Sequence, residues 1–246
     1  MPLQDEVIVI TGASRGIGKT LALAFADAGA IVVASARKAT GPDSIDETVK
    51  LITNNGGRAI AVQCDVASPE DSQNLINTSI EQFGNIDVLI NNAGIYIKKD
   101  IVSFAIDDWD LTMAVNMKGV FLACKYVMPN MMNRSKGNII NISSSMGRKY
   151  TLNDLAYGAS KAGLDRFSTN LANDVREYGI AVNSLCPGYV STDMASHGSP
   201  EPVEVVIPSI LWLAQQTAST FTAQVIDRSE FGHKWGPRIN SESALS

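Results

Sequence analysis

Short runs of apolar residues recur along the chain, and each is followed by a longer stretch in which apolar positions have helical spacing. Most of the runs are apolar at every position, which is typical of parallel strands covered by helices on both sides. Strands are predicted at residues 6–11, 31–34, 59–63, 86–91, 138–143 and 180–185, with a weaker seventh near 223–226. Helices are predicted at residues 17–27, 44–54, 69–82, 107–132, 157–177 and 203–216.

This alternation of strands and helices predicts an α/β fold in which one doubly wound, mostly parallel, seven-stranded sheet has helices on both faces. Ser68 and Pro69 are a suitable N-cap and first residue for the third helix, and the acids that follow favour the positive end of its dipole. No repeat, low-complexity tract or linker divides the sequence. We therefore expect a single domain over residues 1–246.

The composition narrows the classes of protein that fit. The chain has 246 residues, of which 45% are apolar, and 20 basic against 25 acidic side chains give a net charge of −5. Without a basic excess a nucleic-acid partner is disfavoured, and the apolar runs reach only about half a membrane span. The N-terminus lacks the features of a signal peptide, and Cys64, Cys124 and Cys186 are widely spaced, which favours a reducing compartment. A soluble, cytoplasmic protein without a membrane partner is expected.

Three glycines connect the first predicted strand to the first predicted helix. Gly12, Gly16 and Gly18 have the spacing G-x-x-x-G-x-G, with Ser14, Arg15 and Ile17 between them. Glycines at such a turn allow a tight bend, let a pyrophosphate approach the backbone and let the helix pack on the strand. The helix N-terminus would then face the phosphates with free N–H groups. A simple turn is the alternative for an isolated glycine trio.

The segment TGASRGIG at residues 11–18 resembles the cofactor fingerprint of the short-chain dehydrogenase/reductase family. Four further motifs resemble that family in order and distance: Asp-Val at 65–66, Asn-Asn-Ala-Gly at 91–94, Tyr-Gly-Ala-Ser-Lys at 157–161 and Pro-Gly-Tyr-Val-Ser-Thr at 187–192. The resemblance covers roughly residues 5–227. It implies a Rossmann-like fold and an NAD(P)-dependent oxidoreductase.

Tyr157 and Lys161 are four residues apart in a predicted helix, so both project from one face. An ammonium group near a phenol favours the phenolate and would lower a pKa that starts near ~10. Such a tyrosine can give a proton to a carbonyl oxygen, or take one from an alcohol. The resemblance further implies that Ser144 hydrogen-bonds the substrate oxygen and that Asn116 anchors a water connecting Lys161 to solvent.

The resemblance also implies a set of cofactor contacts. Asp65 and Val66 would clamp the adenine ring, and the segment Asn92, Ala93 and Gly94 would back the adenosine ribose. The nicotinamide would lie against Pro187, Gly188, Val190 and Thr192, with Tyr157 and Lys161 close by; the glycine loop would contribute Gly12, Ser14, Arg15, Gly16, Ile17 and Gly18. No pattern of histidines or carboxylates indicates a metal site.

The position after the second strand predicts which cofactor is preferred. NAD-selecting sites place an acid there to bind the ribose 2′-hydroxyl, but this chain has Ala36 followed by Arg37. Arg15 and Arg37 would suit a 2′-phosphate through charge-assisted contacts, so NADP(H) is predicted over NAD(H), whose use stays open. Two solvated arginines are the alternative interpretation.

We therefore predict an NADP(H)-dependent oxidoreductase that interconverts a ketone or aldehyde and an alcohol by hydride transfer. Two alternatives are a 3-oxoacyl-(acyl-carrier-protein) reductase and a non-catalytic NADP(H)-binding sensor or scaffold. A serine hydrolase is excluded because G-x-S-x-G is missing, and His197 and His233 lie in polar loops. The short polar segment at 193–202 predicts an open pocket with broad specificity for small ketones.

Assembly into a homodimer or homotetramer is also expected. The helices at 107–132 and 157–177 have apolar residues on more faces than one sheet contact requires, among them Phe121, Tyr126, Phe167 and Leu171. By resemblance these helices build a dimer, and the family often forms tetramers. After Ile226, however, the usual Asp-Gly-Gly of the family is replaced by Asp-Arg-Ser, which puts the usual C-terminal subunit contact in doubt.

Overall fold

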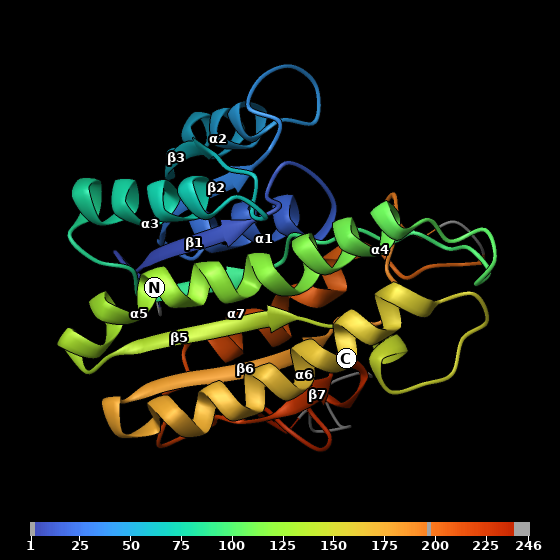
Figure 1. The fold of residues 1–246 in the computed structure, drawn as a ribbon. Coiled ribbons are helices and arrows are strands. Elements are labelled where there is room, and N and C mark those ends of the chain that lie inside the picture. Colours follow the sequence, from blue (N-terminus) through green and yellow to red (C-terminus); the bar gives the residue numbers. More distant parts are fainter. Residues whose placement is uncertain (1–2, 196–197, 239–246) are drawn as a thin grey trace, which may run out of the picture.

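A computed structural model describes residues 3–195 and 198–238 of the chain. Seven strands form one sheet in the order β3-β2-β1-β4-β5-β6-β7 (Figure 1), and every neighbouring pair is parallel. The strands are β1 (Val7–Thr11), β2 (Ile31–Ala36), β3 (Arg58–Gln63), β4 (Val88–Asn91), β5 (Gly137–Ile142), β6 (Ile180–Cys186) and β7 (Val225–Asp227). The predicted architecture is confirmed, and the weak seventh strand begins two residues later and ends one residue later than expected.

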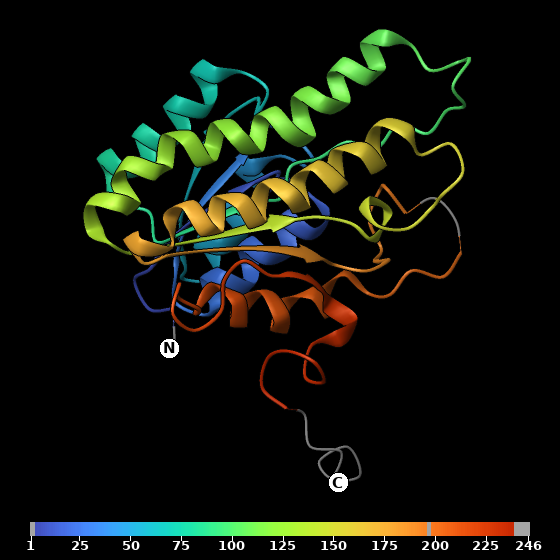
Figure 2. The ribbon, with the colours of Figure 1, turned by 60° about the horizontal axis from the view of Figure 1, so that its bottom comes forward.

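Helices cover both faces of this sheet. Helices α1 (Gly16–Asp27), α2 (Ile45–Asn54) and α7 (Ile207–Ala214) pack on one face. Helices α3 (Pro69–Phe83), α5 (Gly119–Arg134) and α6 (Leu155–Val175) pack on the other. Figure 2 shows α5 and α6, in green and yellow, across the sheet from α7, in orange. The apolar runs of the sequence follow from this double covering, since Ile8 and Ile10 of β1 face one layer while Val7 and Val9 face the other.

The helix predicted at residues 107–132 is interrupted in the structure. It consists of α4 (Ile106–Met113), a π-helical turn (Ala114–Lys118) and α5. Wide turns of this kind insert one extra residue per turn and are frequent at functional sites. The buried Asn116 lies in this turn, so the chain is helical over the whole predicted range, and the helix type changes at the residue where the sequence places an unfavourable asparagine.

The connections of the sheet determine where a ligand can bind. Strand β1 is paired with β2 on one side and with β4 on the other, so the chain changes direction at this point of the sheet. In open α/β sheets the crevice outside the carboxyl ends of the strands at such a switch point is the usual ligand site. The glycine loop follows β1 and the segment at 92–95 follows β4, so both lie at this crevice.

The unusual C-terminal segment folds back onto the sheet. Four aromatic side chains, Trp212, Phe221, Phe231 and Trp235, pack together with ring centroids 4.9–6.2 Å apart. The Trp235 indole N–H donates to the carbonyl of Asp227 at 2.9 Å. Arg228 donates to the carbonyl of Pro187 at 2.7 Å and is ion-paired with Glu201. Arg228, which stands where the family usually has a glycine, therefore holds the segment that follows β6.

The described residues contain neither a membrane-spanning helix nor a cluster of metal-binding side chains. Within residues 3–195 and 198–238, no helix has the length and apolar character needed to cross a membrane. The same residues contain no group of three or more histidine, cysteine or acidic side chains that could hold a metal ion. All three cysteines are buried free thiols, and His233 is exposed as predicted, while His197 lies outside the described residues.

Candidate active site

The glycine loop is packed tightly against the segment after β4. Gly12 and Gly16 have φ angles of 69° and 52°, which other residues rarely adopt. A Cβ on Gly12 would lie 2.9 Å from the Ala93 Cα, and a Cβ on Gly18 would lie 2.2 Å from the Gly12 carbonyl oxygen. The Asn92 side-chain amide donates to the carbonyls of Thr11 and Gly12 at 3.0 and 3.2 Å. The loop therefore requires glycine, and no side chain caps the N-terminus of α1.

A cleft of about 760 Å³ opens at this edge of the sheet. Its volume is typical of small-molecule and cofactor sites. Of the residues predicted to bind the cofactor, those that line the cleft are Gly12, Ser14, Arg15, Gly16, Ile17, Arg37, Asp65, Val66, Asn92, Ala93, Gly94, Tyr157, Lys161, Pro187 and Thr192. The structure thus brings together residues from five motifs that are far apart in the sequence.

Three residues predicted to bind the cofactor do not line the cleft but pack within the loops beside it. Gly18 lies beneath the glycine loop, where a side chain would collide with the loop. Gly188 has a φ of 83° and leaves room for the Arg228 guanidinium, since a Cβ there would lie 3.1 Å from its Nη2. Val190 is buried and forms an isolated bridge with Glu201. Their contribution is to the backbone path of the loops.

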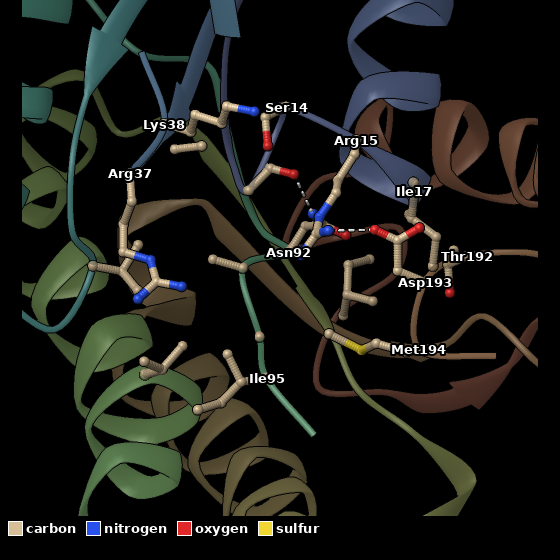
Figure 3. Close-up of a pocket in the computed structure, with 18 of the residues that line it drawn as sticks. Ser14, Arg15, Ile17, Arg37, Lys38, Asn92, Ile95, Thr192, Asp193 and Met194 are labelled. Atoms are coloured by element: carbon tan, nitrogen blue, oxygen red, sulfur yellow. Dashed lines mark hydrogen bonds and ion pairs between the residues drawn. The ribbon is translucent and has the colours of Figure 1, made fainter. Parts of the chain in front are cut away.

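The two arginines predicted to recognise a 2′-phosphate line the same cleft but differ in their surroundings. Arg15 is ion-paired with Asp193, and both side chains are exposed. Figure 3 shows Arg15 directed at Asp193, with Arg37 on the opposite side of the view and Lys38 near it. Ala36, Arg37 and Lys38 all line the cleft. Both predicted arginines therefore line the cleft, Arg15 in an exposed ion pair with Asp193 and Arg37 between Ala36 and Lys38 in the sequence, and their joint binding of a 2′-phosphate stays a prediction.

The predicted catalytic side chains lie together at the ends of β5 and α6. Tyr157 and Lys161 both line the cleft from the first turns of α6. The buried Lys161 ammonium donates to the carbonyl of Ile142, the last residue of β5, at 2.7 Å, and lies 5.6 Å from the centre of the Tyr157 ring. Ser144 follows β5 and makes a side-chain hydrogen bond with Tyr157. This arrangement brings a phenol, a hydroxyl and an ammonium group to one point.

The expected lowering of the Tyr157 pKa is wrong for the protein alone. Burial raises the pKa of Tyr157 to about 12, the charge of Asp154 adds to the rise, and the hydrogen bond with Ser144 only partly opposes it. Burial also lowers the pKa of Lys161 to about 8, against the attraction of Asp165. Desolvation therefore has the largest effect on both groups.

Asn116 is fully buried and connects three parts of the site. Its side chain accepts from the Ile95 N–H at 2.9 Å, donates to the Ile95 carbonyl at 3.0 Å and donates to the Ser160 hydroxyl at 3.1 Å. A Cβ on Gly94 would lie 3.5 Å from the Asn116 Oδ1 and 3.8 Å from the Lys161 Nζ. The π-helical turn thus fixes the loop after β4 against α6, next to Lys161.

Sequence reasoning missed several residues of the cleft. Asp43, Cys64, Ile95, Val115, Ile142, Ser143, Asp193 and Met194 line it as well, and Tyr96 packs on Tyr157 with ring centroids 4.8 Å apart. Asp193 directly follows Thr192, but its partner Arg15 is 178 positions away in the sequence. Only the register of the sheet brings such pairs together, so no local signal could have revealed them.

Comparison with known proteins identifies the family of the chain. A family model described as short chain dehydrogenase matches residues 6–202. The chain belongs to the short-chain dehydrogenase/reductase family and is an oxidoreductase that acts on CH–OH groups.

Its relatives have different substrates. The chain is 40% identical over 207 residues to a 3-oxoacyl-(acyl-carrier-protein) reductase of Synechocystis, with 84% of this chain and 83% of the relative covered. It is 31% identical over 245 residues to glucose 1-dehydrogenase 2 of Bacillus subtilis, with 91% and 93% covered. A crystal structure of an actinorhodin polyketide ketoreductase variant with NADPH superimposes with a TM-score of 0.83 at 29% identity, covering 91% of this chain and 95% of that one.

Proposed function

We propose that this oxidoreductase reduces a ketone or aldehyde to an alcohol, and catalyses the reverse oxidation, with NADP(H) as its cofactor and Tyr157 as the acid/base. The observation that carries the proposal is that Tyr157 and Lys161 line the same cleft as the glycine loop, while Ser144, which does not line it, is hydrogen-bonded to Tyr157. A protein that only bound the cofactor would not need these three groups together. We also propose that the chain acts as one domain in the cytoplasm.

The residues of the cleft fit a dinucleotide. The uncapped N-terminus of α1 and the side-chain-free surface of Gly12 would hold the pyrophosphate. Asp65 and Val66 would hold the adenine, and Pro187 and Thr192 the nicotinamide end. When bound there, the nicotinamide supplies the hydride for the reacting carbon.

The protein's own part in the reaction concerns the carbonyl oxygen. The Tyr157 hydroxyl donates its proton to that oxygen as it gains negative charge, and the Ser144 hydroxyl donates a hydrogen bond to it. Tyr157 is then left as a phenolate in a buried position, where its pKa of about 12 would disfavour it without a nearby positive charge. Lys161, 5.6 Å from the ring, supplies that charge, and Asn116 keeps the Gly94 loop beside it.

A second candidate function is the reduction of 3-oxoacyl chains on acyl carrier protein, which the 40% identity to the Synechocystis relative favours. Absorbance of NADPH at 340 nm, followed with simple ketones, aldehydes, sugars and an oxoacyl thioester, separates the two. Turnover of only the thioester would select the second candidate. Binding of NADPH without turnover of any compound would instead indicate a cofactor sensor.

The buried lysine is expected to reduce the stability of the free protein. Because the pKa of Lys161 falls from 10.5 to about 8 on folding, the folded protein holds this proton less firmly than the unfolded chain. Below pH 8 both states are protonated and the folded state carries the full cost of burial. Lys161→Met should therefore raise the free energy of unfolding by about 1–2 kcal/mol at pH 7, although it abolishes turnover.

Urea unfolding of cofactor-free protein at several pH values tests this expectation. The advantage of Lys161→Met should shrink as pH rises from about 8 towards 10.5, because folded wild-type protein then loses the costly proton while the unfolded chain keeps it. A variant that is less stable than wild type at pH 7 would contradict the argument.

The apolar surfaces of α5 and α6 support the proposal of a homodimer or homotetramer. Phe121 is 48% exposed on α5, while Tyr126, Phe167 and Leu171 are partly exposed. In light scattering at micromolar concentration we expect a mass of two or four times 26.3 kDa. Phe121→Glu should lower that mass, whereas the exposed substitution Lys50→Glu on α2 should not. A wild-type monomer would overturn the proposal.

A further inference from the structure

Arg228 directly follows β7, at a position where the family usually has a glycine. Its side chain is only 13% exposed, although it carries a charge. Its Nε donates to the Pro187 carbonyl at 2.7 Å, and its Nη2 is ion-paired with the Glu201 carboxylate. A charge so far removed from water needs such partners, and both of them belong to the segment that follows β6. A glycine at position 228 could make neither contact.

The segment leaves room for this guanidinium at Gly188. The φ angle of Gly188 is 83°, which favours glycine, and a Cβ there would lie 3.1 Å from the Arg228 Nη2. The same Cβ would lie 3.7 Å from the Glu201 Oε2. A side chain at position 188 would therefore crowd the ion pair, so these three residues fit one another.

The ion pair lies where the segment returns on itself. The Ser191 N–H donates to the Glu201 carbonyl at 2.8 Å, and the Glu201 N–H donates to the Tyr189 carbonyl at 3.0 Å. Arg228 joins the same two strands of chain, because it contacts Pro187 on one and Glu201 on the other. Side-chain and main-chain contacts thus hold residues 187–191 against residue 201.

The backbone that presents Arg228 is itself held in place. Asp227 is paired with Cys186 in the register of β6 and β7. The Asp227 carboxylate accepts from Arg148 at 3.0 Å, and its main-chain carbonyl accepts from the Trp235 indole at 2.9 Å. Arg228 therefore extends from a fixed point of the sheet, and the segment after β6 is positioned relative to that point.

The segment held by Arg228 forms part of the wall of the cleft. Pro187 and Thr192 both line the cleft, whereas Arg228 does not. Thr192 also reaches the glycine loop, since a Cβ on Gly16 would lie 3.2 Å from its Cγ2. A displacement of residues 187–192 would therefore change the cleft wall beside the glycine loop.

We propose that Arg228 is a positioning residue that keeps residues 187–192 in the conformation that binds the nicotinamide end of the cofactor. The inference rests on the proposed function, which assigns Pro187 and Thr192 to that end. A protein whose binding-competent conformation is only partly populated binds its ligand more weakly by that fraction. Arg228 thus contributes to cofactor affinity without lining the cleft itself.

Cofactor binding to Arg228→Met tests this role. The variant keeps a long unbranched side chain and removes the guanidinium. From titrations of cofactor fluorescence we expect the Kd for NADPH to rise by ~10-fold, as it would if the competent conformation fell to about a tenth of the population. The Kd for NADH should rise by the same factor, because both cofactors share the nicotinamide end. With a ketone that the wild type reduces, kcat at saturating NADPH should change by less than about threefold.

Hydrogen exchange of the cofactor-free protein tests the same role without turnover. The Ser191 and Glu201 amides should exchange ~10-fold faster in Arg228→Met, because their mutual contacts open more often. The Ala13 N–H, which donates to the Ser35 carbonyl at 2.9 Å in the glycine loop, serves as the reference amide. Its exchange should stay at the wild-type rate.

Three further variants serve as controls. Arg238→Met removes an exposed arginine of the same C-terminal segment and should leave both Kd values unchanged. Arg228→Lys keeps the charge without the two-sided guanidinium, so it should recover part of the affinity. Glu201→Ala removes a half-exposed carboxylate and keeps the main-chain contacts, so it should raise the Kd by about threefold. It replaces Arg228→Met if that variant does not fold.

The outcomes separate this inference from the proposed function. If wild-type protein binds neither NADPH nor NADH, the proposed function fails, and the role of Arg228 fails with it. If the wild type binds cofactor and Arg228→Met binds it equally well, the positioning role alone is overturned. It is also overturned if kcat falls as far as affinity or if the Ala13 amide exchanges faster, because Arg228 would then only support the structure.

Discussion

Tyr157→Phe should lower kcat by ~10²-fold or more while NADPH still binds. The substitution removes one hydroxyl and keeps the ring, so the packing of Tyr96 on residue 157 and the hydrogen bond from Lys161 to Ile142 stay in place. What is lost is the proton for the carbonyl oxygen. Stopped-flow turnover at saturating NADPH gives kcat, and quenching or enhancement of NADPH fluorescence gives the cofactor Kd.

A control beyond the far end of α6 distinguishes proton transfer from general damage. Tyr178 lies in the 3₁₀ turn (Arg176–Tyr178) after α6, at the opposite end from Tyr157. Tyr178→Phe makes the same chemical change far from the cleft and should leave kcat within about twofold. Near wild-type turnover in Tyr157→Phe would remove Tyr157 from its assigned role and would favour another proton donor, of which Ser144 is the nearest.

The position of the catalytic group could be predicted because it depends on local spacing and on the order of the strands. Four residues of helix place Tyr157 and Lys161 on one face whatever the rest of the chain does. Parallel strands end at the same edge of the sheet, so the segments after β1, β4, β5 and β6 had to meet there. The helix spacing and the common edge of the strands were sufficient to predict most of the residues that line the cleft.

The electrostatics of the site could not be predicted in the same way. The pKa of Tyr157 depends on how deeply it is buried and on Asp154, and the sequence shows neither the burial nor the missing partners of that carboxylate. The π-helical turn at Asn116 was also hidden, because an apolar pattern does not distinguish an α-helix from one with an inserted residue. Both features arise from long-range packing.

Cofactor preference shows how such long-range contacts change a local prediction. The sequence predicts that Arg15 and Arg37 both bind the 2′-phosphate, and it does not distinguish between them. In the structure Arg15 is paired with Asp193, while Gln63 donates to the main-chain carbonyl of Arg37 at 2.9 Å and so fixes the turn after β2. Arg37→Gln should therefore raise the KM for NADPH more than Arg15→Gln does, and neither should much affect the KM for NADH.

Ala36→Asp should reverse the preference from NADP(H) to NAD(H). Ala36 ends β2 and lines the cleft, and its side chain offers nothing to a ribose hydroxyl. An aspartate there would accept from the 2′-hydroxyl of NADH and repel a 2′-phosphate. We expect the ratio of kcat/KM values for the two cofactors to change by ~10²–10³-fold, which corresponds to about 3–4 kcal/mol. The change should come mainly from KM, because residue 36 ends β2, whereas Tyr157 and Lys161, which act on the reacting atoms, belong to α6.

Ala36→Ser is the matched control for this substitution. It introduces a hydroxyl of similar size without a charge, so it should improve NADH use only slightly and should still accept NADPH. Initial rates with both cofactors at one saturating ketone concentration measure all three proteins on the same scale. Equal kcat/KM for NADPH and NADH in the wild-type protein would overturn the assignment, because Arg37 and Lys38 would then add nothing to the binding of the 2′-phosphate.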